Sequence, residues 1–115
     1  MFINAWDLAR FGYLFLNNGR WGDRQLVSPE WIAMAKSPGP ANANYGFMNW
    51  YLNTPNPQTG QRPLASAPAS SVMFVGLGQN IVVIDWEHDV LIVVRWIRGA
   101  ALYEFLGQVL GAIVD

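Results

Sequence analysis

The order of elements along the chain predicts an α+β fold, an antiparallel sheet with helices packed on it. Helical patterns come first, at residues 5–16 and 28–35. Strand patterns follow, the strongest being two β-branched runs at 81–84 and 90–97 that flank a short polar link. A last apolar stretch, 99–114, repeats at helical spacing. We therefore expect N-terminal helices, a sheet, and a C-terminal helix packed on that sheet.

The first helix is predicted to begin after Asn4, whose side chain can accept a hydrogen bond from a first-turn amide. Asp7 then lies near the positive end of the helix dipole. Asn17, Asn18 and Gly19 end the helix, because Asn and Gly tolerate the left-handed conformation of a C-cap. Nearly every side of this helix carries apolar residues, so we expect it to be sandwiched between other elements.

The second helix is predicted to begin at Ser28, with Pro29 in the first helical position, and to end before Pro38. A turn around Gly22 separates the two helices. Residues 37–44 are expected to form a loop. An aromatic-rich strand is predicted at 45–52, and a long irregular connection at 53–71.

The two β-branched runs flank the link 85–89 and predict a hairpin. Neither run alternates cleanly with polar residues, so both faces should be covered and the hairpin should lie in the middle of the sheet. Just before it stands a segment with two glycines and two amides: Gly76, Leu77, Gly78, Gln79 and Asn80. A ligand can approach the backbone at the glycines because no Cβ obstructs it.

Composition narrows the classes of function. The chain has 115 residues, of which 52% are hydrophobic and only 13% charged, against roughly 25% charged in a typical soluble domain. We therefore expect part of its surface to be covered by a partner, by a second copy, or by the rest of a longer chain. The net charge is −1 and the basic residues are scattered, which argues against nucleic acid. No apolar run approaches the length of a membrane span.

The polar link contains the single histidine, His88, between Glu87 and Asp89. We interpret it as a charged surface turn rather than a catalytic or metal pair, because adjacent side chains point apart. Asp85, Glu87 and Asp89 lack the spacing of a calcium loop, and cysteine is absent. The sequence therefore predicts neither a metal nor a cofactor.

Three stretches together resemble a known family. Residues 5–19 read A-W-D-L-A-R-F-G-Y-L-F-L-N-N-G, and 21–32 read W-G-D-R-Q-L-V-S-P-E-W-I. Tyr45, Gly46 and Phe47, with Trp50 nearby, look like a Y-G-x-x-W strand, and 76–96 resemble closing strands of the type V-D-P-E-x-D-L-V-V-V-x-R-W. In this order they resemble the serine beta-lactamase-related hydrolases: class C beta-lactamases, their esterase relatives and penicillin-binding proteins. Trp86 stands where that family usually has proline.

The resemblance implies acyl transfer through a serine of an S-x-x-K motif, helped by a Y-x-N tyrosine and a K/H-T/S-G motif. The one lysine, Lys36, is preceded three residues earlier by Ala33, so no S-x-x-K exists in this chain. Residues 51–53 read Y-L-N, but they follow the 5–19 helix whereas the family's copy precedes it. We therefore expect no catalytic side chain in these 115 residues, and little or no activity from the chain alone.

The counterpart of K/H-T/S-G is expected within 76–80, with Leu77 in the Lys/His position. Leucine cannot donate a proton, but a backbone N–H near Gln79 or Asn80, on the sheet edge, could supply half of an oxyanion hole. By this resemblance, residues 76–80 form a substrate-binding wall. The whole chain, 1–115, would be the C-terminal portion of a beta-lactamase-like domain: a helical segment at 1–44, then a sheet and C-terminal helix at 45–115.

Two hypotheses about function remain open. In the first, the chain is a piece of a hydrolase whose catalytic groups lie upstream, and its partner is the remainder of that chain. In the second, it is a free-standing, non-catalytic module that binds a partner, or a second copy, through its apolar surface. A ligand pocket near 76–80 without chemistry is a third idea. Members of the family are often periplasmic or secreted, but this sequence shows no signal-peptide pattern.

Overall fold

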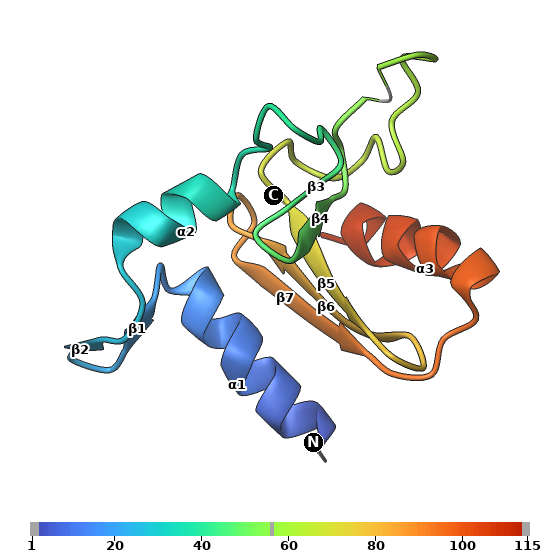
Figure 1. The fold of residues 1–115 in the computed structure, drawn as a ribbon. Helices are drawn as coiled ribbons and strands as arrows, with labels where there is room; N and C mark the ends of the chain where they lie inside the picture. Colours follow the sequence, from blue (N-terminus) through green and yellow to red (C-terminus); the bar gives the residue numbers. More distant parts are fainter. Residues whose placement is uncertain (1–2, 56, 114–115) are drawn as a thin grey trace.

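The structure, a computed structural model, describes residues 3–55 and 57–113, and confirms the α+β fold (Figure 1). Five strands form one antiparallel sheet in the order β3-β4-β5-β6-β7, and β1 and β2 form a separate small hairpin. The elements are α1 (Ala5–Leu16), β1 (Arg20–Trp21), β2 (Arg24–Gln25), α2 (Pro29–Ala35), β3 (Tyr45–Gly46), β4 (Asn49–Tyr51), β5 (Val72–Gly76), β6 (Asn80–Asp85), β7 (Val90–Val94) and α3 (Gly99–Gly111).

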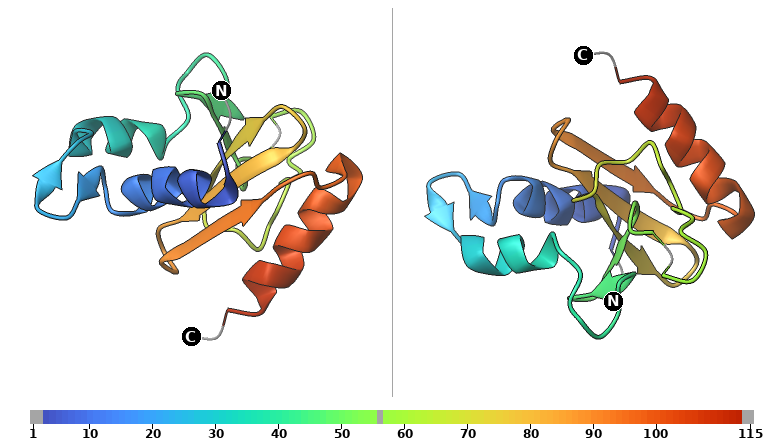
Figure 2. Two further views of the ribbon diagram at one scale, coloured as in Figure 1. Left: turned by 90° about the horizontal axis from the view of Figure 1, so that it is seen from below. Right: turned by 90° about the horizontal axis from the view of Figure 1, so that it is seen from above.

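The sheet separates two hydrophobic cores, with α1 on one face and α3 on the other (Figures 1 and 2). Along β6, Ile81 and Val83 belong to the α3 core, while Val82 and Ile84 belong to the α1 core. Successive side chains of a strand point to opposite faces. The unbroken apolar run 81–84 is therefore explained by a strand that is buried on both sides, as predicted.

Both N-terminal helices begin as predicted. At α1 the backbone N–H of Asp7 donates to Asn4 Oδ1 at 2.9 Å, and Asp7 in turn accepts from the Asn4 backbone, which completes a capping box. At α2 the Ser28 hydroxyl accepts from the Trp31 backbone N–H, with Pro29 in the first helical position. Asn18 has a φ of 52°, in the left-handed region expected where α1 ends.

The expectation that α1 is sandwiched is wrong within the described residues. Its buried positions are Gly12 and Phe15 alone, and only the side that faces the sheet is covered. Trp6 is 76% exposed and Tyr13 is 50% exposed. The helix therefore behaves as a surface layer here, although its outer side carries aromatic residues.

The segment 45–52 is not one strand but a tight hairpin of β3 and β4. Phe47 and Met48, at its turn, have φ values of 49° and 65°. Two consecutive left-handed residues reverse the chain with the twist that a two-residue hairpin needs. The described residues of the connection 53–71 are irregular as predicted. The connection is anchored by Leu64, whose backbone N–H donates to Leu52 O at 3.0 Å.

Residues 81–94 form the predicted hairpin, but its position in the sheet differs from the prediction. β6 is an interior strand, while β7 is the last strand of the sheet among the described residues. Sheet order depends on contacts between distant segments, which the local pattern does not contain. The C-terminal helix ends at Gly111 rather than at 114, and position 114 lies outside the described residues.

Gly12 allows α1 to lie directly on the sheet. A Cβ at this position would stand 2.3 Å from Leu91 Cδ1 and 2.8 Å from Val82 Cγ1. We predict that Gly12→Ala lowers the free energy of unfolding by ~1–3 kcal/mol, because the overpacking outweighs the gain in helix propensity. Urea denaturation monitored by circular dichroism measures the change.

The matched control for Gly12→Ala is Gly111→Ala at the end of α3, where an added Cβ meets nothing within 4 Å. That variant should be as stable as the parent or more stable by up to ~1 kcal/mol. Equal effects at the two glycines would show that α1 does not approach the sheet as closely as described.

Candidate functional site

Residues 76–80 form the turn that joins β5 to β6. Gly76 pairs with Asn80 across the hairpin. Gly78 and Gln79 have φ values of 76° and 57°, and Leu77 at the tip is 97% exposed. The segment therefore projects from one end of the sheet, which corrects the expectation that it lies along a sheet edge.

The Asn80 side chain, supported by Arg95, holds this turn in shape. Asn80 Nδ2 donates to Leu77 O at 2.6 Å, and Asn80 Oδ1 accepts from Arg95 Nε at 2.8 Å. Arg95, which follows β7, thereby connects the turn to the neighbouring strand. Its appearance within an apolar run was a signal of a polar contact, although the sequence alone did not identify the partner.

Trp96 packs on the same turn. A Cβ on Gly78 would stand 2.1 Å from Trp96 Cζ3, so only glycine permits this approach. Trp96 itself has a φ of 59° and remains 70% exposed. The turn and this indole thus form one exposed surface, and Trp96 is a neighbour that sequence reasoning missed.

The chemistry open to this surface is limited by its side chains. Residues 76–80 contain glycine, leucine and two carboxamides, and so no acid, base or nucleophile. Carboxamides and backbone N–H groups can donate hydrogen bonds to a carbonyl or an oxyanion. The segment can therefore position a polar ligand, but it cannot by itself break a bond.

Tyr51, in the Y-L-N sequence, lies in the α1 core rather than at this surface. It is buried, and its hydroxyl donates to Ser37 O at 2.7 Å. Burial raises the pKa of Tyr51 above its ordinary value, an effect that a side-chain hydrogen bond with Asn49 partly offsets. A tyrosine that holds its proton more tightly is a poor general base.

Lys36 joins three segments at the other end of the molecule. Its ammonium donates to Asn18 Oδ1 at 2.9 Å and lies 4.5 Å from the centre of the Trp86 ring. Partial burial lowers the pKa of Lys36 below its ordinary value. Trp86 thus has a packing role in this chain.

His88 lies in the β6–β7 turn and pairs with Asp85. Its Nδ1 stands 2.8 Å from Asp85 Oδ2. The other carboxylate oxygen of Asp85 accepts backbone N–H groups from Glu87 and His88, at 3.0 and 3.2 Å. The interpretation of 85–89 as a charged surface turn fits Glu87 and Asp89, which are exposed, but not Asp85, whose fully buried side chain shapes the turn from the end of β6.

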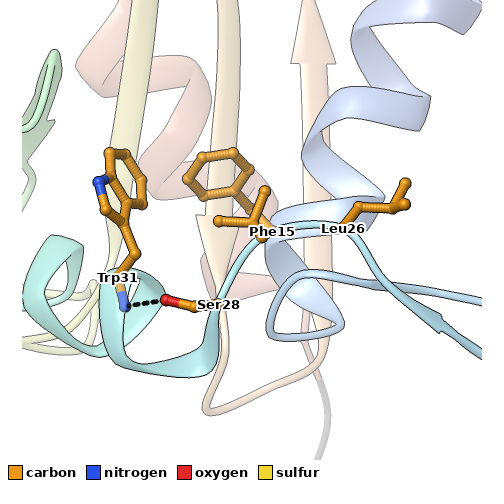
Figure 3. A pocket seen from close by; sticks show the side chains of 5 residues that line it. Phe15, Leu26, Ser28 and Trp31 are labelled. Atoms are coloured by element: carbon orange, nitrogen blue, oxygen red, sulfur yellow. Dashed lines mark hydrogen bonds between the residues drawn. The ribbon is translucent and has the colours of Figure 1, made fainter.

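A hollow of about 330 Å³ lies between the end of α1 and the start of α2 (Figure 3). Phe15 and Trp31 flank it with aromatic rings, and the Ser28 hydroxyl beside it already accepts from the Trp31 backbone. Its lining residues are Phe15, Leu26, Val27, Ser28 and Trp31. None of these belongs to 76–80, so this cavity gives no support to a pocket at that turn.

Among residues 3–55 and 57–113, no group of three or more histidine, cysteine or acidic side chains gathers as metal ligands would. Within the same residues, no helix has the length and hydrophobicity to cross a bilayer.

Tyr51 generates a prediction about alkaline pH. A tyrosine whose pKa is raised in the folded state keeps its proton at pH values where the unfolded chain has lost it. Its contribution to the free energy of unfolding is therefore complete below the ordinary pKa of 10.0 and is lost as the pH rises above that value. Tyr51→Phe should cost about 1 kcal/mol at pH 7 through the lost hydrogen bond. The difference in the free energy of unfolding between this variant and the parent chain should shrink above pH 10. Urea unfolding at pH 7, 9 and 10.5 measures it. A deficit that stays constant over this range would contradict the raised pKa.

Comparison with known proteins shows that this chain has a fold similar to part of a solved structure. Neither a protein-family model nor a curated protein matches the chain. A solved structure does, that of a "putative beta-lactamase" from Bacteroides dorei, with a TM-score of 0.58 and 17% sequence identity. The match covers 91% of this chain and 39% of that protein, so the chain spans well under half of its structural neighbour's length. The matched part of this chain thus has a fold similar to part of that protein.

Proposed function

We propose that this chain is the C-terminal portion of a beta-lactamase-like serine hydrolase. The full-length family hydrolyses amides, esters or lactams through an acyl-serine. The observation that carries the proposal is the likeness of fold over 91% of the chain to a protein of which it spans only 39%. The three sequence motifs, which occur in the family's order, support it independently.

Within that hydrolase, residues 76–80 form a wall of the substrate site. The turn is suited to this role because Asn80, Arg95 and the Trp96 indole hold it in one shape. A preorganised N–H near Gln79 or Asn80 stabilises developing negative charge without a cost of reorientation in the transition state. The exposed Leu77 then lies where the family carries lysine or histidine, and contributes an apolar contact only.

The nucleophile and its proton acceptor come from outside these residues. Three side chains that could take part in acyl transfer are already engaged. Tyr51 is buried, Lys36 lies on Trp86, and His88 is paired with Asp85. The isolated chain is therefore inactive, because a serine hydroxyl is a weak nucleophile without a nearby base.

A second candidate is a non-catalytic module that binds a partner. It is favoured by the apolar side chains that stand in solvent at several places, among them Trp6, Met48, Leu77 and Trp96. Such residues are common at sites of protein association. In this reading the turn at 76–80 is a contact surface and no upstream catalytic segment is needed.

The proposal predicts that the isolated chain reacts with neither a chromogenic cephalosporin nor a fluorophosphonate. Its intact mass should be unchanged after incubation, with a serine beta-lactamase labelled in parallel as the positive control. A stoichiometric adduct would mean that a nucleophile exists within these 115 residues, and the assignment of catalysis to another segment would be wrong.

A longer polypeptide separates the two candidates. The hydrolase proposal expects a natural protein in which an S-x-x-K segment precedes this sequence and which a fluorophosphonate labels at that serine. Gly78→Val in that protein should lower kcat at least tenfold, because the added side chain displaces Trp96 and the turn. Gly60→Val, at a distant glycine with open space around it and a similarly positive φ, is the control. Absence of such a segment would favour the partner-binding module.

A further inference from the structure

Buried polar groups join α2 to the β3–β4 hairpin, which the chain enters through residues 36–44 (Figure 1). The end of a helix leaves carbonyl oxygens without helical partners. Two side chains of β4 bind carbonyls at this end of α2. Asn49 Nδ2 donates to Ala35 O at 3.3 Å, and the Tyr51 hydroxyl donates to Ser37 O at 2.7 Å. The hairpin therefore caps the C-terminal end of α2.

Two carboxamide oxygens at this joint have no hydrogen-bond donor among the described residues. Asn49 is completely buried, and its Oδ1 is unpartnered although its Nδ2 is engaged. Asn44 Oδ1 is likewise hidden from solvent and without a donor. The Asn49 amide cannot simply be turned over, because its oxygen would then face the Ala35 carbonyl. Buried acceptors without donors are costly and rare in native proteins, so these two oxygens require a partner.

The register of the hairpin brings the two oxygens to one face. Gly46 is the partner of Asn49 across the hairpin. The Tyr51 backbone N–H donates to Asn44 O at 3.0 Å, so Asn44 stands opposite Tyr51. Residues opposite each other, and residues two apart along one strand, point to the same face. Asn44 and Asn49 are thus diagonal neighbours on the face that turns toward the end of α2.

Gly46 leaves space on this face, directly opposite Asn49. A Cβ at Gly46 would stand 3.3 Å from the Tyr51 hydroxyl oxygen, and apart from Tyr51 and the glycine's chain neighbours no described atom would be nearer than 4.0 Å. The φ of Gly46 lies outside the left-handed region, so backbone conformation does not require glycine here. The position therefore has room for one more small group beside the two oxygens.

We propose that one internal water molecule is bound in the space beside Gly46 and donates hydrogen bonds to Asn44 Oδ1 and Asn49 Oδ1. Water suits this site because it carries two donors, and each of the two oxygens requires one. Internal waters commonly satisfy buried polar groups in this way. The water completes the polar joint and thereby fixes α2 on the hairpin. Both oxygens are already hidden within the described residues, so the inference depends neither on the proposed hydrolase nor on any further segment of chain.

Nuclear Overhauser spectroscopy between water and the protein tests the proposal directly. The chain should show a cross-peak between the water signal and the Gly46 Hα protons, which do not exchange with solvent. The exchangeable proton of the Tyr51 hydroxyl could produce the same signal, so the measurement is repeated on Tyr51→Phe, where the cross-peak should persist. Its absence from the parent chain, its loss in Tyr51→Phe, or a crystal structure with a direct Asn44–Asn49 hydrogen bond would overturn the proposal.

Two substitutions at Gly46 test the same site through stability. Gly46→Ala puts a methyl group into the space of the water, so both oxygens lose their donor. Gly46→Ser puts a hydroxyl there, which can donate to one of them in place of the water. The equilibrium constant for unfolding, measured by urea denaturation, should therefore be at least about fivefold larger for Gly46→Ala than for Gly46→Ser. Without the water, the extra oxygen of serine would only add crowding, and Gly46→Ser would be no more stable than Gly46→Ala.

Gly76 provides the matched control. Like Gly46 it ends a strand just before a hairpin turn, where it pairs with Asn80, but it is exposed, and an added Cβ would meet only Asn80 atoms, at 3.5 and 3.8 Å. Gly76→Ala and Gly76→Ser should differ in their unfolding constants by no more than about twofold, because no buried acceptor gains or loses a donor there. A difference between alanine and serine that is no larger at Gly46 than at Gly76 would overturn the proposal.

Discussion

The fold depends on the burial of β6 on both faces. Residues Ile81, Val82, Val83 and Ile84 are all essentially inaccessible to solvent, and they alternate between the α3 core and the α1 core. The α1 core and the α3 core thus pack on opposite faces of the same short strand. A one-residue slip of β6 would exchange its side chains between two cores of different shape, so the register is strongly determined. The placement of α1, α3 and the turn at 76–80 follows from that register.

Much of the local structure could be predicted from the sequence because its signals are local. Asn4 and Asp7 carry a capping box within one turn of helix, and Ser28 with Pro29 marks the start of α2 in the same way. Strand propensity was sufficient to locate the β6–β7 hairpin. The hairpin at Phe47 and Met48 escaped prediction because its left-handed residues are neither glycine nor asparagine, so its usual signal is absent.

The candidate site was predictable as a segment but not as a surface. Two glycines beside a strand indicated a place where the backbone is accessible. The contacts that shape it, Arg95 to Asn80 and Trp96 to Gly78, join residues 15 and more positions apart through the pairing of β6 with β7. The edge position of β7 was missed for a similar reason, since a strand that is apolar on both faces has the same sequence whether or not a further strand lies beside it.

The buried carboxylate of Asp85 has a consequence for how the chain folds. It is hydrogen-bonded within the four-residue turn that it introduces, so the β6–β7 hairpin closes over a very short loop. Joining β4 to β5 instead requires residues 52–71 to be closed first, at a larger entropic cost. The β5–β6 connection is equally short, so low contact order favours early pairing of β5, β6 and β7, and we expect the β3–β4 hairpin to join this sheet afterwards.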